Sequence, residues 1–304
     1  MINFSISIKP TNNPSIVKFE ANKFLTQNEN FEFKNIEEAK NSTLAQQLFH
    51  LPFVKTVYIA QNFVAIEKYN IVEWGDIQEE LSEQIENFLN SGEPIINSTE
   101  NKSTKLVPVT VYAESTPNPA VMKFVTNRKL VISTSEFKNI DQTKNAPLPQ
   151  KLFHFPFIKE VFIDENYISI NKYDLVEWED ITSEIREFIR EYIQNGGIVL
   201  NEEHFEEEKQ TTGTEKISEP KRLYDDTSLQ IIDILDEYVK PAVASDGGNI
   251  LFDSYNEENQ TVKVILQGAC SGCPSSTFTL KNGIENMLKE MMPQKVAKVE
   301  AING

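Results

Sequence analysis

Cys270 and Cys273 are the only cysteines of this 304-residue chain, and they stand three positions apart in the segment Gly268–Pro274. Thiolates are the form in which cysteine binds metals and attacks electrophiles. Two of them at this spacing can hold one metal together or close a disulfide. Gly268 and Gly272 leave the loop without bulky side chains, so backbone amides can face the sulfurs and an inorganic group can approach them closely.

Three kinds of site fit the pair. An iron–sulfur cluster needs about four protein thiolates, so a chain with two predicts a cluster that bridges a symmetric dimer. Zinc also needs four ligands, and no other Cys or His in this part of the chain completes the set. A dithiol redox centre is the third interpretation, although no aromatic residue precedes Cys270 and the strands before it are expected to form a hairpin. Replacement of either cysteine by serine is expected to change the fold little, because both lie in a loop.

The elements around the thiols predict a small domain of order α-β-β-α-β. Leu229, Ile232, Leu235 and Val239 fall on one face of a helix that ends near Pro241. Ser245–Gly248 is a tight glycine turn. The pattern then predicts a hairpin of strands 249–255 and 261–267, a helix from Pro274 towards Pro293, and a final strand over 296–302. The thiols therefore precede a helix N-terminus, where unpaired amides and the helix dipole favour thiolates.

The first two thirds of the chain contain one module written twice. The segments Asn13–Phe19, Leu48–Lys55 and Lys68–Trp74 return as Asn118–Phe124, Leu152–Lys159 and Lys172–Trp178. In each copy, the pattern of apolar residues predicts two strands around an Asn-Pro turn, a short helix, a β-hairpin and a closing amphipathic helix. The fold class is therefore α+β, with three small two-layer α/β sandwich modules, of which two are tandem repeats and one is the C-terminal α-β-β-α-β domain.

Neither copy contains a cysteine, and we expect no catalytic residue in either. His50 and His154 are expected to be helix-terminal residues, and Trp74 and Trp178 to fill core.

The domain boundaries follow from the repeats and from changes in composition. We expect modules at 1–95, 107–195 and 225–304, with a flexible acidic linker over 196–224. A linker of this length tethers the last module without fixing its position.

Overall composition limits the partners and the compartment. The chain has 46 acidic and 29 basic residues, with a net charge of −17, which argues against nucleic acid as a partner because phosphates require a cationic face. No apolar stretch approaches the length needed to cross a membrane. Two cysteines do not form a disulfide framework, and residues 1–8 alternate like a strand instead of forming a presequence, so the expected compartment is the cytoplasm.

The C-terminal residues resemble a known family. The segments Asp246–Ile250, Val262–Ser276 and Thr279–Glu285 are similar to the C-terminal domain of the NifU/Nfu family, over nearly all of 225–303. The repeated module, with Thr116–Pro119 and a closing Glu-Trp, resembles the Nfu N-terminal domain. The first copy departs from this signature with Thr11–Pro14, and two copies instead of one are also a departure.

The resemblance implies an iron–sulfur protein that is not an enzyme. It implies a cluster, [4Fe-4S] rather than [2Fe-2S], held between two protomers by Cys270 and Cys273 and passed to apo-proteins after receipt from upstream assembly machinery. Asp246 and Gly247 are expected to be structural. The chain lacks the Cys-rich scaffold and ferredoxin-like domains of full-length NifU, so a carrier is favoured over an assembly scaffold, with a thiol-disulfide oxidoreductase as the alternative. Recognition of client or donor proteins by the duplicated module is a hypothesis.

Overall fold

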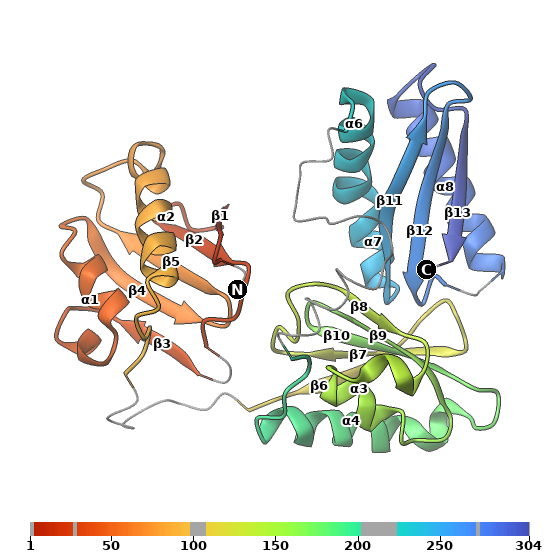
Figure 1. The fold of residues 1–304 in the computed structure, drawn as a ribbon, viewed down its shortest axis with the longest axis horizontal. Helices are drawn as coiled ribbons and strands as arrows, with labels where there is room; N and C mark the ends of the chain where they lie inside the picture. Colours follow the sequence, from red (N-terminus) through yellow and green to blue (C-terminus); the bar gives the residue numbers. More distant parts are fainter. Residues whose placement is uncertain (1–2, 27–28, 98–107, 202–223, 272–273, 304) are drawn as a thin grey trace. The chain divides into compact units, whose positions relative to one another are not determined.

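The computed structural model describes residues 3–26, 29–97, 108–201, 224–271 and 274–303. These residues divide into two compact units, Met1–Pro108 and Val109–Gly304. The first unit contains one sheet-containing module and the second contains two (Figure 1). The expected α+β class with three small modules is confirmed.

The first module is a five-stranded antiparallel sheet covered by helices. The strand order is β1-β2-β5-β4-β3, so the predicted β4–β5 hairpin lies inside the sheet. The amphipathic helix α2 buries its apolar stripe, including Leu81 and Ile85, in the same core as α1. The elements are β1 (Ile6–Pro10), β2 (Ile16–Ala21), β3 (Asn30–Phe33), α1 (Thr43–Phe49), β4 (Val54–Ala60), β5 (Phe63–Lys68) and α2 (Trp74–Asn90).

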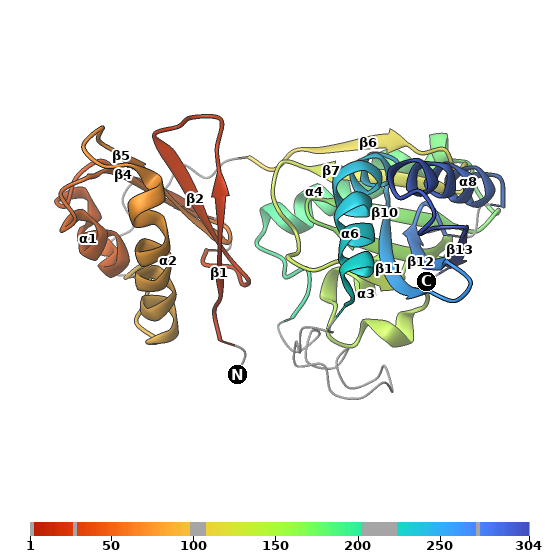
Figure 2. The same ribbon diagram turned by 90° about the horizontal axis from the view of Figure 1, so that it is seen from above.

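The second module repeats this architecture. Its strand order is β6-β7-β10-β9-β8, and every neighbouring pair is antiparallel. Figure 2 gives a second view of both copies. The elements are β6 (Val111–Ser115), β7 (Val121–Thr126), β8 (Ser135–Phe137), α3 (Pro147–Leu152), β9 (Ile158–Asp164), β10 (Tyr167–Lys172) and α4 (Trp178–Gln194).

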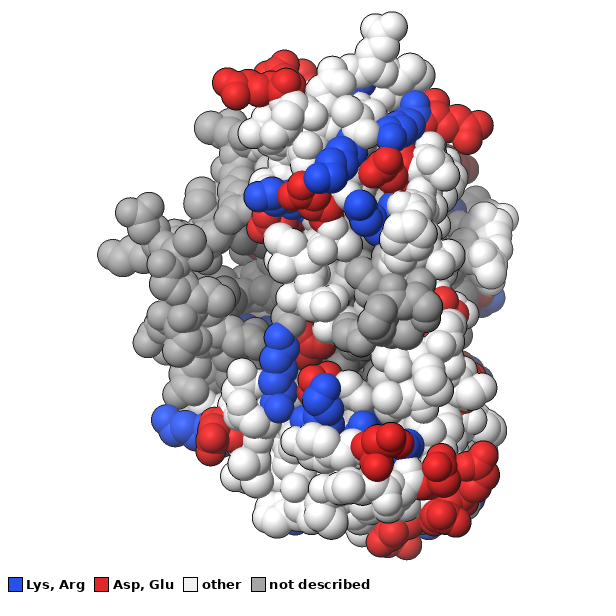
Figure 3. All heavy atoms as spheres, turned by 90° about the vertical axis from the view of Figure 1, so that its right-hand side faces the viewer, with Lys and Arg blue, Asp and Glu red and all other residues white. Residues whose placement is uncertain are grey.

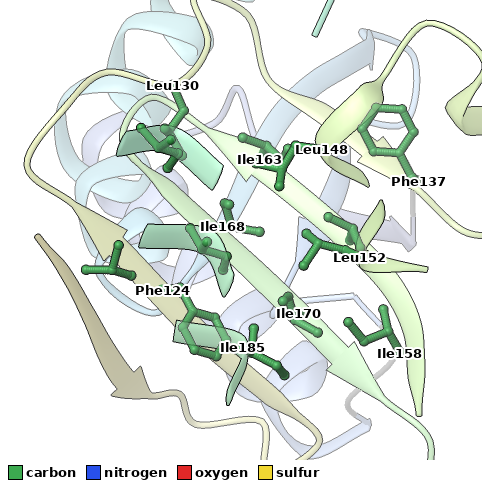
Figure 4. Close-up of a cluster of buried hydrophobic side chains, with 14 of the residues drawn as sticks. Phe124, Leu130, Phe137, Leu148, Leu152, Ile158, Ile163, Ile168, Ile170 and Ile185 are labelled. Carbon is green, nitrogen blue, oxygen red and sulfur yellow. The ribbon is translucent and has the colours of Figure 1, made fainter. Parts of the chain in front are cut away.

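The core of the second module lies between the sheet and its helices (Figure 4). Alternate residues of β10, Ile168 and Ile170, point into it together with Phe124 of β7 and Ile185 of α4. All four side chains are fully buried. The opposite face of the same sheet therefore carries the intervening residues of each strand.

The two tryptophans connect the closing helix to the Asn-Pro turn. Trp74 and Trp178 are the first residues of α2 and α4, and their Nε1–H groups donate to the carbonyls of Pro14 and Pro119, at 3.0 and 3.1 Å. Each ring also packs edge-on against a phenylalanine of the neighbouring strand. The two sequence signatures of the module are thus parts of one contact.

The histidines lie at helix ends, as expected. His50 directly follows α1, and Nδ1 of His154 lies 2.8 Å from the carbonyl oxygen of Gln150, one turn earlier.

The third module is a three-stranded sheet with helices packed against it (Figure 1). The first two strands form an antiparallel hairpin, whereas the second and third pair in parallel, so the helix between them is a crossover connection. The predicted order is confirmed. The elements are α6 (Asp226–Ile234), a π-helical segment Leu235–Val239, α7 (Lys240–Ser245), β11 (Gly248–Asn256), β12 (Thr261–Gly268), α8 (Pro274–Met291) and β13 (Lys298–Asn303).

The surface charge is mixed in sign. Basic and acidic side chains lie beside one another on the face that Figure 3 shows. In the third module, Lys298 Nζ lies 2.7 Å from the Glu300 carboxylate. Among the described residues, no helix is both long and apolar enough to span a membrane.

Candidate functional site

The cysteine loop joins the end of β12, at Gly268, to the start of α8, at Pro274. Cys270 follows β12 by two residues, and Pro274 opens α8 as predicted. Cys273 lies outside the residues that the structure describes, so its expected role as a ligand remains a prediction. The N-terminus of an 18-residue helix places a favourable dipole next to this segment.

The glycine turn before β11 lies against the cysteine loop. Gly248 and Gly268 pair across the β11–β12 hairpin. The amide of Ala269 donates to the carbonyl of Gly247, at 3.1 Å. Gly247 and Gly268 have φ angles of +80° and +61°, which residues with a Cβ rarely adopt. The expected structural role of Gly247 follows from this geometry, because it turns the chain and also contacts the loop.

Gly248 is a site residue that the sequence analysis missed. A Cβ built at Gly248 would lie 2.6 Å from Cys270 Sγ and 2.9 Å from the carbonyl oxygen of Gln267. Both distances are shorter than van der Waals contact, so glycine at this position lets the sulfur lie against the strand backbone. The second glycine of the pair was a visible signal, but its spacing does not reveal which of the two approaches a sulfur.

Gly248→Ala is therefore expected to displace Cys270 and to destabilise the third module. The loss in free energy of unfolding should be about 1–3 kcal/mol, as for other overpacked sites. Gly283→Ala in α8 is the matched control, because a Cβ there meets nothing within 4 Å and alanine favours a helix interior by roughly 0.5–1 kcal/mol. Hydrogen exchange of the β12 amides measures the stability of the third module in both variants. Equal protection of these amides in the two variants would contradict the role of Gly248.

Cys270 is buried, with 7% of its surface exposed. It belongs to the core cluster of the third module, together with residues such as Val264 and Leu288. In the described part of the chain, no three His, Cys, Asp or Glu side chains lie close enough together to hold a metal ion. The sequence places both thiols in a loop without bulky side chains, and the structure shows that Cys270 is also a core side chain.

Side chains of the second module also reach this site, which the sequence analysis did not predict. Tyr167 Oη donates to the carbonyl of Gly248 at 2.8 Å, and Ser169 Oγ donates to that of Gly247 at 2.6 Å. Asn118 Nδ2 donates to the carbonyl of Ala269 at 3.2 Å. The expectation that the last module is only tethered is therefore wrong, because Val109–Gly304 forms one compact unit.

Two ionisable groups in these contacts are perturbed. Burial raises the pKa of the Tyr167 hydroxyl, and the nearby Asp164 carboxylate adds to the shift, so the phenol remains a neutral donor. Burial also raises the pKa of the Glu136 carboxyl, although a hydrogen bond from the amide of Gly268, at 2.9 Å, opposes the shift.

These features define a class of protein, in which a Cys-x-x-Cys segment joins a strand to a helix in a small α+β module behind two repeated modules. The chain belongs to the Nfu/NifU family, and the resemblance seen in the sequence is confirmed. Residues 6–92 and 111–196 each match the family model described as the scaffold protein Nfu/NifU N terminal, and residues 231–300 match the NifU-like domain.

Relatives are about one third identical to the chain over the residues that align. It is 31% identical over 196 residues to a NifU-like protein of Schizosaccharomyces pombe, across 64% of this chain and 73% of the relative. It is 33% identical to the NFU1 iron-sulfur cluster scaffold homolog, mitochondrial, of Drosophila willistoni, across 63% of each. It is 31% identical to NifU-like protein 4, mitochondrial, of Arabidopsis thaliana, across 64% of this chain and 66% of the relative. The chain thus spans about two thirds of the length of these relatives.

The expected cytoplasmic location is wrong. Two of these relatives carry "mitochondrial" in their names, and none of the three carries "cytoplasmic". The expectation rested on the strand-like pattern near the N-terminus. That pattern does predict β1 (Ile6–Pro10), but a strand in the fold says nothing about the compartment in which the protein works.

Proposed function

We propose that this chain is an iron–sulfur cluster carrier in which Cys270 and Cys273 of two protomers hold one cluster between them. Family membership supports a scaffold or carrier role. The observation that carries the proposal is the loop itself, where Cys270 lies between the end of β12 and the N-terminus of α8, in a chain with only two cysteines. Two protomers supply the four thiolates that a cluster requires.

The finer points rest on family membership and on the number of ligands. Four thiolates can hold either cluster type, and the family leads us to favour [4Fe-4S] over [2Fe-2S], in a loaded form that is a homodimer. The cargo comes from upstream assembly machinery and goes to apo-proteins, and the names of the relatives lead us to place this exchange in mitochondria. The protein needs no catalytic residue for this task. We retain residues 225–304 as the cluster-binding domain, 1–95 and 107–195 as the repeated domains, and 196–224 as the acidic linker between the last two.

Anaerobic reconstitution of the full chain with ferrous iron and sulfide tests this function. We expect a brown protein, about four iron atoms per dimer for a [4Fe-4S] cluster, and a doubling of the mass measured by light scattering. Colourless protein that reduces insulin disulfides would favour the thiol-disulfide oxidoreductase. Protein that stays strictly monomeric while it carries stoichiometric iron would contradict the bridging site.

A further inference from the structure

The outer sheet face of the second module is buried although its strands carry polar residues there. An antiparallel sheet covered by helices on one face usually exposes the other to water. In β10, however, the outward-facing Tyr167 and Ser169 are both buried, with 4% and 2% of their surfaces exposed. The neighbouring Lys123 of β7 is also buried. Something must cover this face, and the covering residues belong to the third module.

The contacts consist of side chains from the sheet and main chain from the glycine turn. Besides the bonds from Tyr167 and Ser169, Lys123 Nζ donates to the carbonyls of Ala244 and Ser245, at 3.0 and 3.1 Å. Those carbonyls end α7, where a cation is favourable because helix C-termini carry partial negative charge. The surface therefore recognises a helix C-terminus followed by a turn.

The packing leaves no room for side chains on the turn. A Cβ built at Gly247 would lie 2.8 Å from Ser169 Oγ, and one at Gly268 would lie 2.8 Å from a ring carbon of Phe162. Both glycines border the cysteine loop. This fit is specific to a backbone with glycine at both positions.

The first module has the same framework without the two hydroxyl groups. The registers match, because Lys18 pairs with Ala65 across β2 and β5 as Lys123 pairs with Ser169 across β7 and β10. Phe63 stands where the second copy has Tyr167.

The lysine of the first module also has a different partner. Lys18 Nζ binds Glu20 of its own strand at 2.6 Å, where the second copy has Val125. The two copies thus differ in the donors that bind the turn, and only the second has them.

We propose that the sheet face of the second module is a binding surface for the glycine turn and cysteine loop of the third module, and that this docked state competes with formation of a cluster-bridged dimer. The regulatory part of this proposal rests on the proposed carrier function. The first module lacks the surface.

Competition follows from what the docked state covers. Asn118 binds the carbonyl of Ala269, next to Cys270. The Glu136 side chain accepts the amide hydrogen of Gly268, so the second module already occupies a backbone donor of this loop. A second protomer that brings its own thiols to Cys270 must approach through the same space, so the second module has to move away first.

Alkylation of Cys270 in cluster-free protein tests the docking. A Cys273→Ser background leaves one thiol in the full chain. In this background, Tyr167→Phe with Ser169→Ala gives the second module the residues of the first, and we expect iodoacetamide to react about tenfold faster, because two buried hydrogen bonds that favour the docked state are lost. The matched control is Tyr173→Phe with Ser133→Ala, the same chemical changes at exposed positions, and its rate should stay within about twofold of the parent. Equal rates for the two variants would overturn the docking.

Hydrogen exchange separates undocking from unfolding. The amide hydrogen of Gly268 is donated to the Glu136 carboxyl group. It should exchange with solvent faster in the Tyr167→Phe, Ser169→Ala variant than in the parent. Amides of Phe124 and Ile163, in the central strands of the second module, should stay as protected as in the parent. Unchanged exchange at Gly268 would also overturn the docking.

The competition is tested with both cysteines intact. During reconstitution, the Tyr167→Phe, Ser169→Ala variant should dimerise faster than the parent protein. Equal rates of dimerisation would overturn the competition. If neither protein takes up a cluster, the proposed function fails, but the alkylation result still decides the docking because it involves no iron.

Discussion

Cys270→Ala and Cys273→Ala are each expected to abolish cluster binding and the dimerisation that accompanies it. Each substitution removes one ligand per protomer and therefore two of the four that a bridging cluster requires. We expect iron retention and visible absorption after anaerobic reconstitution to fall to background, and the mass in solution to remain that of a monomer. Elemental analysis and light scattering measure the two effects.

The choice of alanine for this test comes from the structure. The loop position of both thiols predicts that Cys→Ser changes the fold little, but Cys270 lies in the core cluster of the third module with 7% of its surface exposed. A serine hydroxyl there would be buried among apolar side chains, at a cost of about 1–3 kcal/mol unless it finds a partner. Alanine avoids that cost at the price of a small cavity.

Ser271→Ala is the matched control because it changes the same loop and keeps both thiols. Its backbone amide, which binds the carbonyl of Gly268 at 3.0 Å, is preserved by the substitution. Reconstitution of this variant should match the parent protein. A cysteine variant that still dimerises and retains stoichiometric iron would show that other ligands hold the cluster.

The modular plan could be predicted from the sequence because it depends on strong local signals. The repeat is visible in matched segments such as Leu48–Lys55 and Leu152–Lys159, and the helices α2 and α4 follow from apolar residues at a spacing of four. The strands β3 and β8 were missed. They have four and three residues and lie at sheet edges, where too few positions alternate to give a pattern.

The docking surface could not be predicted because its residues are ordinary in a strand. Tyr167 and Ser169 fit the alternating pattern of β10, and nothing in that pattern tells an exposed outer face from a covered one. Only the difference between copies is informative, with Phe63 and Ala65 at the same positions of the first module. Such a difference identifies where two copies diverge, but the partner becomes visible only when Gly247 and Gly248 are placed against it.

Phe124→Ala is expected to unfold much of the second module and to expose Cys270, whereas Phe19→Ala should unfold the first module and leave Cys270 protected. The two phenylalanines are equivalent, because both are fully buried and both pack edge-on against a tryptophan, at 6.4 and 6.5 Å between ring centroids. Each substitution should cost about 3–5 kcal/mol. For a module of this size that is a large part of the total stability, which is typically of the order of 0.1 kcal/mol per residue.

Calorimetry of the full chain should therefore show a similar loss of one unfolding transition in each variant. Alkylation of Cys270 in the Cys273→Ser background then distinguishes them, since only the second module binds the glycine turn. A rise in reactivity with Phe124→Ala alone places the protective contact in that module. Equal reactivity in the two variants would mean that Cys270 is protected by the core of its own module, through neighbours such as Val264 and Leu288, and that the two copies do not differ in what they do for the thiol.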